Sequence, residues 1–113
     1  MDITFKTKKL EKTFNSEKEL NKIYGAKRAR KIIMRMKILA TANTLDDVPI
    51  SPPTRCHQLQ EDRNEQFAVV ITDNWRLIFI INQNPLPRKE DGGIEKSLAT
   101  KIKILEVEDY HGK

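Results

Sequence analysis

The sequence has a single cysteine, Cys56, only two histidines, His57 and His111, and four glycines among 113 residues. One cysteine excludes an internal disulfide, and a lone cysteine with two histidines at no ligand spacing argues against a zinc site. No glycine-rich stretch has the spacing of a phosphate-binding loop. If the chain is an enzyme, these absences favour acid–base chemistry by side chains alone, with no metal and no other cofactor.

The chain also lacks any apolar run near the roughly 20 residues that a transmembrane helix needs. Its first residues do not combine a basic start with a long apolar segment, so they do not resemble a signal peptide. Charged residues make up 33% of the sequence and hydrophobic residues 38%, which is typical of a folded domain rather than a disordered one. We therefore expect a cytoplasmic protein with one domain over 1–113 and no membrane partner.

Positive charge is unevenly distributed along the chain. Lys and Arg number 21 against 16 Asp and Glu, a net charge of +5, and no acidic residue occurs between Glu19 and Asp46. A small basic domain attracts polyanions, of which nucleic acid is the commonest in a cytoplasm. A solvated helix face is the alternative interpretation. A predicted helix over 26–42 carries the basic residues expected to contact RNA, the ribosome or an acidic partner segment: Lys27, Arg28, Arg30, Lys31 and Arg35.

The first third of the chain predicts a strand followed by helices. Ile3 and Phe5 alternate with polar neighbours, as in a short strand. Ser16, with Glu19 three residues later, has the pattern of a capping box, and Gly25 offers a helix stop before the basic helix. Helices are expected over 8–14, 16–24 and 26–42.

The rest of the chain, beyond a proline-rich connection, predicts strands. β-rich runs over 66–72 and 75–81 flank an Asp-Asn turn, which is typical of an antiparallel hairpin. Both runs are apolar on both parities, so we expect the hairpin at the centre of the sheet, covered on both faces. A long mobile loop is expected over 82–100 and a last strand over 101–108. This order predicts an α+β fold, with an N-terminal strand and helices packed on a mainly antiparallel sheet of about four to five strands.

Two groups of residues are candidates for chemistry. Arg76 is a charge inside an otherwise apolar strand, and an unpaired buried guanidinium is costly, so it should be paired, at a strand end or facing a cleft. In a cleft its planar guanidinium would match phosphate oxygens, whereas a structural salt bridge is the alternative. The chain ends on Asp109, Tyr110 and His111, and a strand would place the first and third on one side. Histidine has an unperturbed pKa of about 6.5, which suits proton transfer, although each histidine alone is also compatible with a structural role.

These segments together resemble the HigB toxins of the RelE/ParE superfamily. The resemblance rests, in chain order, on a His-x-Leu element beginning at His57, an Asp-Arg pair ending at Arg63, an Asn-Trp-Arg element ending at Arg76 and an Asp-Tyr-His tail ending at His111. It covers nearly the whole chain. Family members often have a lysine at the position of Gln60 and a tight turn in place of 82–100. These departures put one phosphate contact and the docking of partners in doubt, but they delete none of the candidate chemical groups.

The resemblance implies a compact RelE-like fold and a toxin of a type II toxin–antitoxin system. It implies cleavage of messenger RNA in the ribosomal A site, giving a 2′,3′-cyclic phosphate and a 5′-hydroxyl. Its partners would be the ribosome, messenger RNA and a HigA-like antitoxin, whose helix-turn-helix would bind operator DNA.

The resemblance also implies roles for the candidate residues. Arg76 would stabilise charge in the transition state, and His57 and His111 would transfer protons. Asp109 would orient a partner or act as base. Tyr110 would stack on a nucleotide base or donate a hydrogen bond.

Two other functions remain open. A toxin of the ParE type shares this fold but inhibits DNA gyrase by binding, although a pure binder has no need of the acid–base groups at the C-terminus. A small RNA- or ribosome-binding module without activity would also account for the basic helix over 26–42.

Overall fold

A five-stranded sheet runs through the protein, with strand order β1-β5-β4-β3-β2. The computed structural model describes residues 1–109. All neighbouring strands are antiparallel except β1 and β5, which pair in parallel. The predicted α+β fold with a mainly antiparallel sheet is therefore confirmed. The strands are β1 (Asp2–Phe5), β2 (His57–Gln58), β3 (Gln66–Thr72), β4 (Trp75–Ile81) and β5 (Lys101–Asp109).

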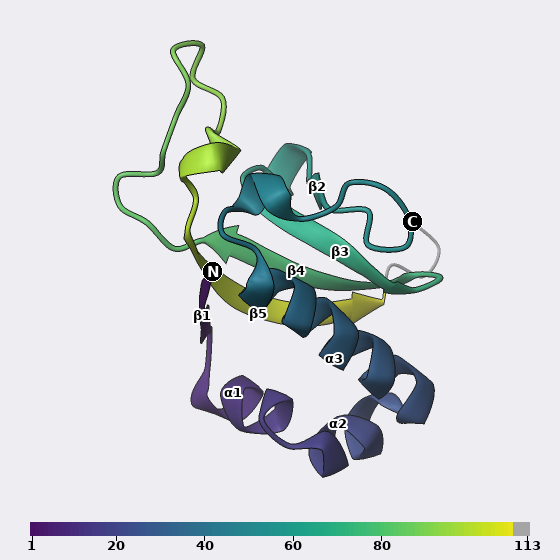
Figure 1. Cartoon of the computed structure of the whole chain (residues 1–113). Helices are drawn as coiled ribbons and strands as arrows, with labels where there is room; N and C mark the ends of the chain where they lie inside the picture. Colours follow the sequence, from purple (N-terminus) through teal and green to yellow (C-terminus); the bar gives the residue numbers. More distant parts are fainter. Residues whose placement is uncertain (110–113) are drawn as a thin grey trace.

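Three helices follow β1 along the chain: α1 (Lys8–Phe14), α2 (Glu17–Tyr24) and α3 (Ala26–Thr41). Figure 1 shows α3 crossing one face of the sheet, with α1 and α2 beside it toward the β1 edge. The side chain of Ser16 accepts a hydrogen bond from the amide of Glu19 at 3.1 Å, as the predicted cap requires. Gly25 separates α2 from α3 at φ +87°, a conformation that L side chains rarely adopt. No helix of the described chain is long and apolar enough to span a membrane.

The main core lies between α3 and the sheet. Alternate residues of β3 and β4, among them Phe67 and Phe79, point toward the helices and are buried. The two rings stack with their centroids 5.8 Å apart. Ile32 and Leu39 of α3 close this layer from the helix side, both without measurable exposure.

The opposite face of the sheet is covered only in part. Leu59, which follows β2, packs there with Ala68 and Ile78 in a smaller cluster. Val70 and Ile80 on the same face are only half-buried. The expected burial of the hairpin on both faces is therefore confirmed at Ala68 and Ile78, and it is wrong at Val70 and Ile80. The reason is that helices cover one face of the sheet alone.

The segment over 82–100 has local structure of its own and extends beyond the sheet (Figure 1). Arg88 and Ile94 form an isolated antiparallel bridge, and a 3₁₀ helix, η3 (Lys96–Leu98), precedes β5. Ile94 and Ala99 are buried in the main core. Ile94 and Ala99 therefore hold the second half of this segment against the body of the protein. The mobility of the segment stays a prediction.

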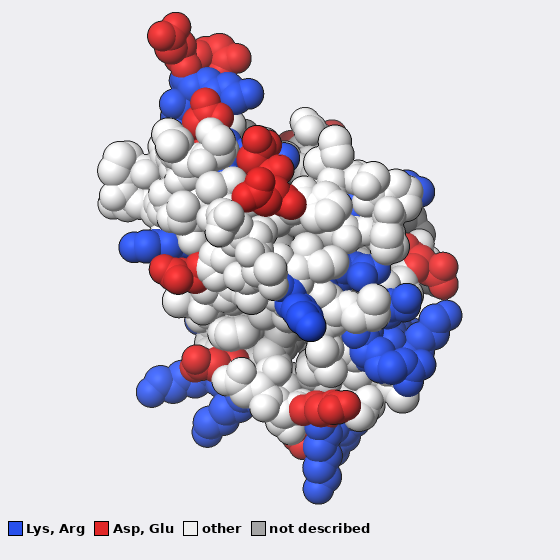
Figure 2. Space-filling view, viewed as in Figure 1, with Lys and Arg blue, Asp and Glu red and all other residues white. Residues whose placement is uncertain are grey.

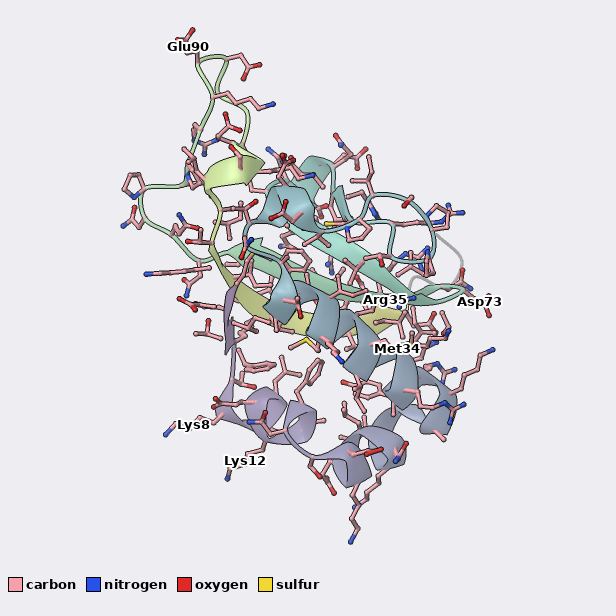
Figure 3. All side chains as sticks on the ribbon, in the orientation of Figure 1. Lys8, Lys12, Met34, Arg35, Asp73 and Glu90 are labelled. Atoms are coloured by element: carbon pink, nitrogen blue, oxygen red, sulfur yellow. The ribbon has the colours of Figure 1, made fainter. Side chains whose placement is uncertain are left out.

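Arg35 is buried, which corrects its assignment to the basic surface. It is 2% exposed, and its Nε donates to the carbonyl oxygen of Val70 at 2.7 Å. Figure 3 shows its place on α3, beside the sheet. Position 35 falls three residues after Ile32 and four before Leu39, so the helical period places it on the buried side. The guanidinium therefore joins α3 to β3 instead of facing a ligand.

We predict that Arg35→Ala lowers the free energy of unfolding by about 2 kcal/mol, because a charge-assisted hydrogen bond and its packing are lost. Urea unfolding followed by the fluorescence of Trp75, the single tryptophan, measures this. Arg30→Ala removes an exposed arginine from the same helix and should change stability by less than about 0.5 kcal/mol. Equal losses in the two variants would contradict the structural role of Arg35.

Candidate active site

The open face of the sheet brings two predicted site residues together. Cross-strand partners point to the same face of a sheet. His57 pairs with Ala68, and Arg76 pairs with Val70, two residues further along β3. Neighbouring strands lie about 4.8 Å apart, so the backbones of β2 and β4 are separated by about 10 Å across β3. This spacing leaves room for a phosphodiester between the imidazole and the guanidinium.

Arg76 lies at the hairpin end of β4 and is half-buried. Its Nη1 donates to the carbonyl oxygen of Asp73 and, at 3.1 Å, to that of Trp75. The guanidinium is therefore held against the turn of the hairpin, which agrees with the expectation of a strand end. These contacts use carbonyl oxygens as acceptors, and they orient the side chain at the end of β4.

His57 is exposed on the edge strand β2. Its Nδ1 lies 2.7 Å from the carbonyl oxygen of Arg55. A carbonyl can only accept, so Nδ1 carries the hydrogen and, in the neutral ring, Nε2 keeps its lone pair. This tautomer suits a general base.

Asp109 lies on the other face of the sheet from Arg76. It pairs with Trp75, whose ring contacts the helices, whereas the preceding Glu108 pairs with Arg76. The cause is a β-bulge in which residue 105 of β5 is an extra residue opposite the step from Ile78 to Phe79 of β4. Beyond the bulge, each side chain of β5 points to the face opposite to the one that strict alternation would give it. Tyr110 and His111, the other predicted tail residues, lie outside the described residues.

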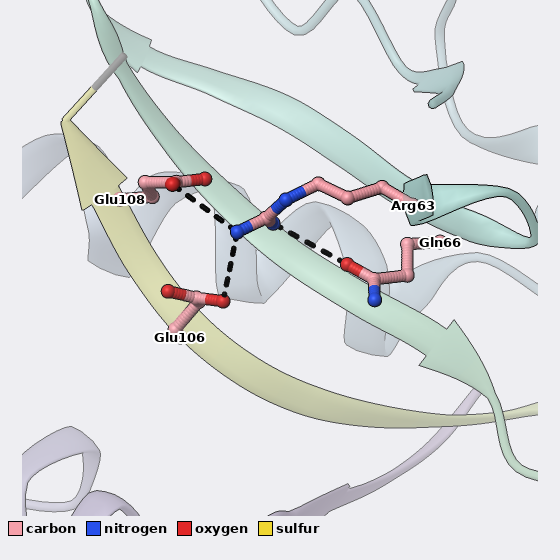
Figure 4. Close-up of polar contacts among 4 residues, drawn as sticks. All are labelled: Arg63, Gln66, Glu106 and Glu108. Atoms are coloured by element: carbon pink, nitrogen blue, oxygen red, sulfur yellow. Dashed lines mark hydrogen bonds and ion pairs between the residues drawn. The ribbon is translucent and has the colours of Figure 1, made fainter. Parts of the chain in front are cut away.

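The same bulge brings two glutamates to the open face, where Arg63 binds both (Figure 4). Arg63 belongs to a 3₁₀ helix, η2 (Glu61–Arg63), between β2 and β3. Its Nη2 lies 3.1 Å from Glu108 and 3.4 Å from Glu106, and its Nη1 donates to Gln66 at 3.3 Å. Arg63, Glu106 and Glu108 are not among the site residues predicted from the sequence. The sequence signal of the two glutamates is the alternation of charge at the end of β5, and the face to which they point depends on the bulge. Arg63 belongs to an Asp-Arg pair within the segment that resembles the HigB toxins.

A family model described as RelE-like toxin of type II toxin-antitoxin system HigB matches residues 3–87. The chain belongs to the HigB-like toxin family. The resemblance stated from the sequence is therefore confirmed, and membership of a type II system implies an antitoxin partner. No curated protein matches the chain closely. The family match includes His57, Arg63 and Arg76 and ends before β5.

Some basic residues of α3 in this HigB-like toxin are exposed, and others are engaged in contacts within the protein. Lys27 and Arg30 are exposed and Lys31 is partly exposed. Figure 2 shows lysine and arginine side chains gathered over the end of the molecule where α3 begins. Arg28, by contrast, donates to the carbonyl oxygen of Tyr24 at 2.8 Å, and its guanidinium lies 4.4 Å from the centre of the Trp75 ring. Of the five cations predicted to make contacts on this helix, Lys27, Arg30 and Lys31 therefore remain accessible, and Lys37 of α3 is exposed as well.

Cys56 lies next to His57 in the sequence, but it is not part of an accessible site. It is 3% exposed within the main core. Burial raises the pKa of its thiol to about 11, and the charge of Lys96 opposes this only in part. Over residues 1–109, no group of three or more His, Cys, Asp and Glu side chains is arranged to hold a metal ion.

We predict that Cys56 in the folded toxin reacts with iodoacetamide at pH 8 about 100-fold more slowly than in urea, because the raised pKa depletes the thiolate. Mass spectrometry at timed intervals measures the rate. The folded rate should increase with pH until the protein unfolds. A native rate equal to that in urea would mean that the thiol is accessible and ionised.

Proposed function

We propose that this HigB-like toxin cuts messenger RNA on the ribosome by acid–base catalysis. The observation that carries the proposal is the placement of His57 and Arg76 on one open face of the sheet. Family membership supports it, because the match names a toxin of a type II system. Neutralisation by a cognate HigA-like antitoxin belongs to the same proposal.

The proposed reaction uses the 2′-hydroxyl of the nucleotide before the cut. A base removes its proton, the 2′-oxygen attacks phosphorus, and the bond from phosphorus to the 5′-oxygen breaks. An acid returns a proton to the leaving oxygen, giving a 2′,3′-cyclic phosphate and a 5′-hydroxyl. Nε2 of His57 suits the base, and the guanidinium of Arg76 suits the charge that develops on the phosphate oxygens.

The C-terminal residues complete this proposal. We assign the acid to His111 and base stacking or hydrogen bonding to Tyr110. Asp109 lies on the face of β5 opposite Glu108, so we assign it an orienting role at the end of the strand rather than direct contact with the phosphate.

Dependence on the ribosome is part of the same proposal. Two hollows of the protein are lined by residues of the helices, their neighbouring loops and β1, and neither includes His57 or Arg76. The reaction needs the 2′-oxygen aligned with the leaving group, and among the described residues neither hollow holds the RNA against His57 and Arg76. Positioning of this kind supplies much of the rate in such reactions, and we propose that the ribosomal A site provides it.

We predict that the purified protein cuts a defined messenger RNA on programmed ribosomes and leaves the free RNA intact. Arg76→Ala and His57→Ala should each reduce the cleavage rate by about 100-fold or more, as loss of a transition-state contact does. Mapping of the 3′ ends, with detection of the cyclic phosphate, measures this. Arg88→Ala, which removes an exposed arginine paired with Glu65 at 2.7 Å, is the matched control.

Absence of cuts from a protein that still stops growth would overturn the proposal in favour of gyrase inhibition. A chain ending at Glu108 separates the two functions further. It should lose toxicity as a nuclease while still binding its antitoxin. Intact toxicity of this shortened chain would contradict a catalytic tail.

We also propose that the outer surface of α3 binds the antitoxin. Lys27, Arg30 and Lys31 occupy its first turns, and Met34 follows on the same side (Figure 3). From there the surface continues into an apolar groove of about 520 Å³. A partner segment with acidic residues at one end and apolar residues at the other complements this surface. The groove residues are Met34, Lys37, Ile38, Thr41, Ala42, Asp47 and Pro49.

We predict that Met34→Glu, and separately the reversal of Lys27, Arg30 and Lys31 to Glu, weaken binding of the antitoxin encoded in the same operon by at least about tenfold. Calorimetry at two salt concentrations measures both, and the charge reversal should change the salt dependence more than the single substitution does. Reversal of Lys8, Lys9 and Lys12 on α1 makes the same change in net charge and is the control. Unchanged antitoxin affinity together with weaker ribosome association would assign the surface to the ribosome instead.

A further inference from the structure

The open face carries two carboxylates where the proposed function needs to admit a polyanion. Glu108 is the direct cross-strand partner of Arg76, and Glu106 is the partner of Ile78 on the same face. Oε2 of Glu108 is buried and has no hydrogen-bond partner among the described residues. These carboxylates would repel a phosphate bound next to Arg76, and their partial burial limits the screening of this repulsion by solvent.

Arg63 supplies the opposite charge at this place. Its guanidinium reaches both carboxylates from η2 with a single nitrogen, and its other terminal nitrogen donates to Gln66 (Figure 4). The Arg63 and Glu108 side chains are each 29% exposed, so the pair is more shielded than an ordinary surface salt bridge. Arg63, Arg76, Glu106 and Glu108 together carry no net charge. Without Arg63 the same group would carry one negative charge.

Arg63 also connects two parts of the candidate site that are far apart in the sequence. His57 lies on β2, which has only two residues. The chain continues from β2 through Leu59 to η2, and the amide of Leu59 donates to the carbonyl oxygen of Gln66 at 2.8 Å. The ion pairs of Arg63 then join this connection to β5, 43 and 45 residues later. They cross the face that holds Arg76.

We propose that Arg63 is a positioning residue that neutralises Glu106 and Glu108 beside Arg76 and so makes this face accessible to RNA. The inference rests on the proposed nuclease function. Arg63 acts through the two glutamates, and direct contact with the RNA is not required. Its removal therefore harms the site because the glutamates remain, and removing their charge as well restores it.

The experiment compares the wild type, Arg63→Gln, and Arg63→Gln combined with Glu106→Gln and Glu108→Gln. Affinity for programmed ribosomes is measured across a series of salt concentrations, and cleavage rates at saturating and limiting protein are measured separately. We expect Arg63→Gln to weaken affinity about tenfold at low salt, and less at high salt. The triple variant should return to within about twofold of the wild type. Arg88→Gln removes an arginine from the exposed Arg88–Glu65 pair and should change affinity by less than about twofold, because the change lies away from this face.

The outcomes separate the possible roles of Arg63. Failure of the triple variant to recover, with its melting temperature unchanged from the wild type, would mean that Arg63 contacts RNA directly and would overturn the inference. Equal losses in Arg63→Gln and Arg88→Gln would assign the effect to net charge and also overturn it. Recovery of ribosome affinity in a protein that never cuts RNA would support the inference and reject the nuclease function.

Discussion

The register of β4 between β3 and β5 is the constraint on which the rest of the structure depends. Strand side chains alternate with a period of two, so a shift of one residue would turn Arg76 toward the helices and expose Phe79. The stack of Phe67 on Phe79, 5.8 Å apart in the core, opposes such a shift. The charged side chains of the open face are therefore placed by apolar contacts on the opposite side of the same strands.

Local patterns in the sequence were sufficient for the elements, because caps, helical spacing and β-rich runs act over a few residues. The cap of Ser16 and the hairpin around β3 and β4 are of this kind. Arg35 shows the limit of reading charge alone, since its spacing indicated burial and its charge indicated exposure. The surroundings of Asp109 and Arg63 could not be predicted from the sequence for another reason. Their surroundings depend on the bulge and on strand pairing between segments tens of residues apart.

The two surfaces of the protein share little except Trp75. On the helix side its ring contacts Tyr24 and Arg28, and its carbonyl oxygen accepts a hydrogen bond from Arg76. The exposed cations of α3 and the open face of the sheet otherwise lie on opposite sides of the main core. The proposed binding of an antitoxin and the proposed cleavage of RNA would therefore place separate demands on the sequence.

The position of β5 determines when the sheet can form during synthesis of the protein. This strand lies between β1 and β4 in the sheet, yet it is the last of the five to be synthesised. Asp2–Phe5 therefore waits for its parallel partner until residues 101–104 have left the ribosomal tunnel. The ion pairs of Arg63 with Glu106 and Glu108 form later still. The charged face that would act on ribosomes therefore cannot form until β5 has emerged from the ribosome that makes it.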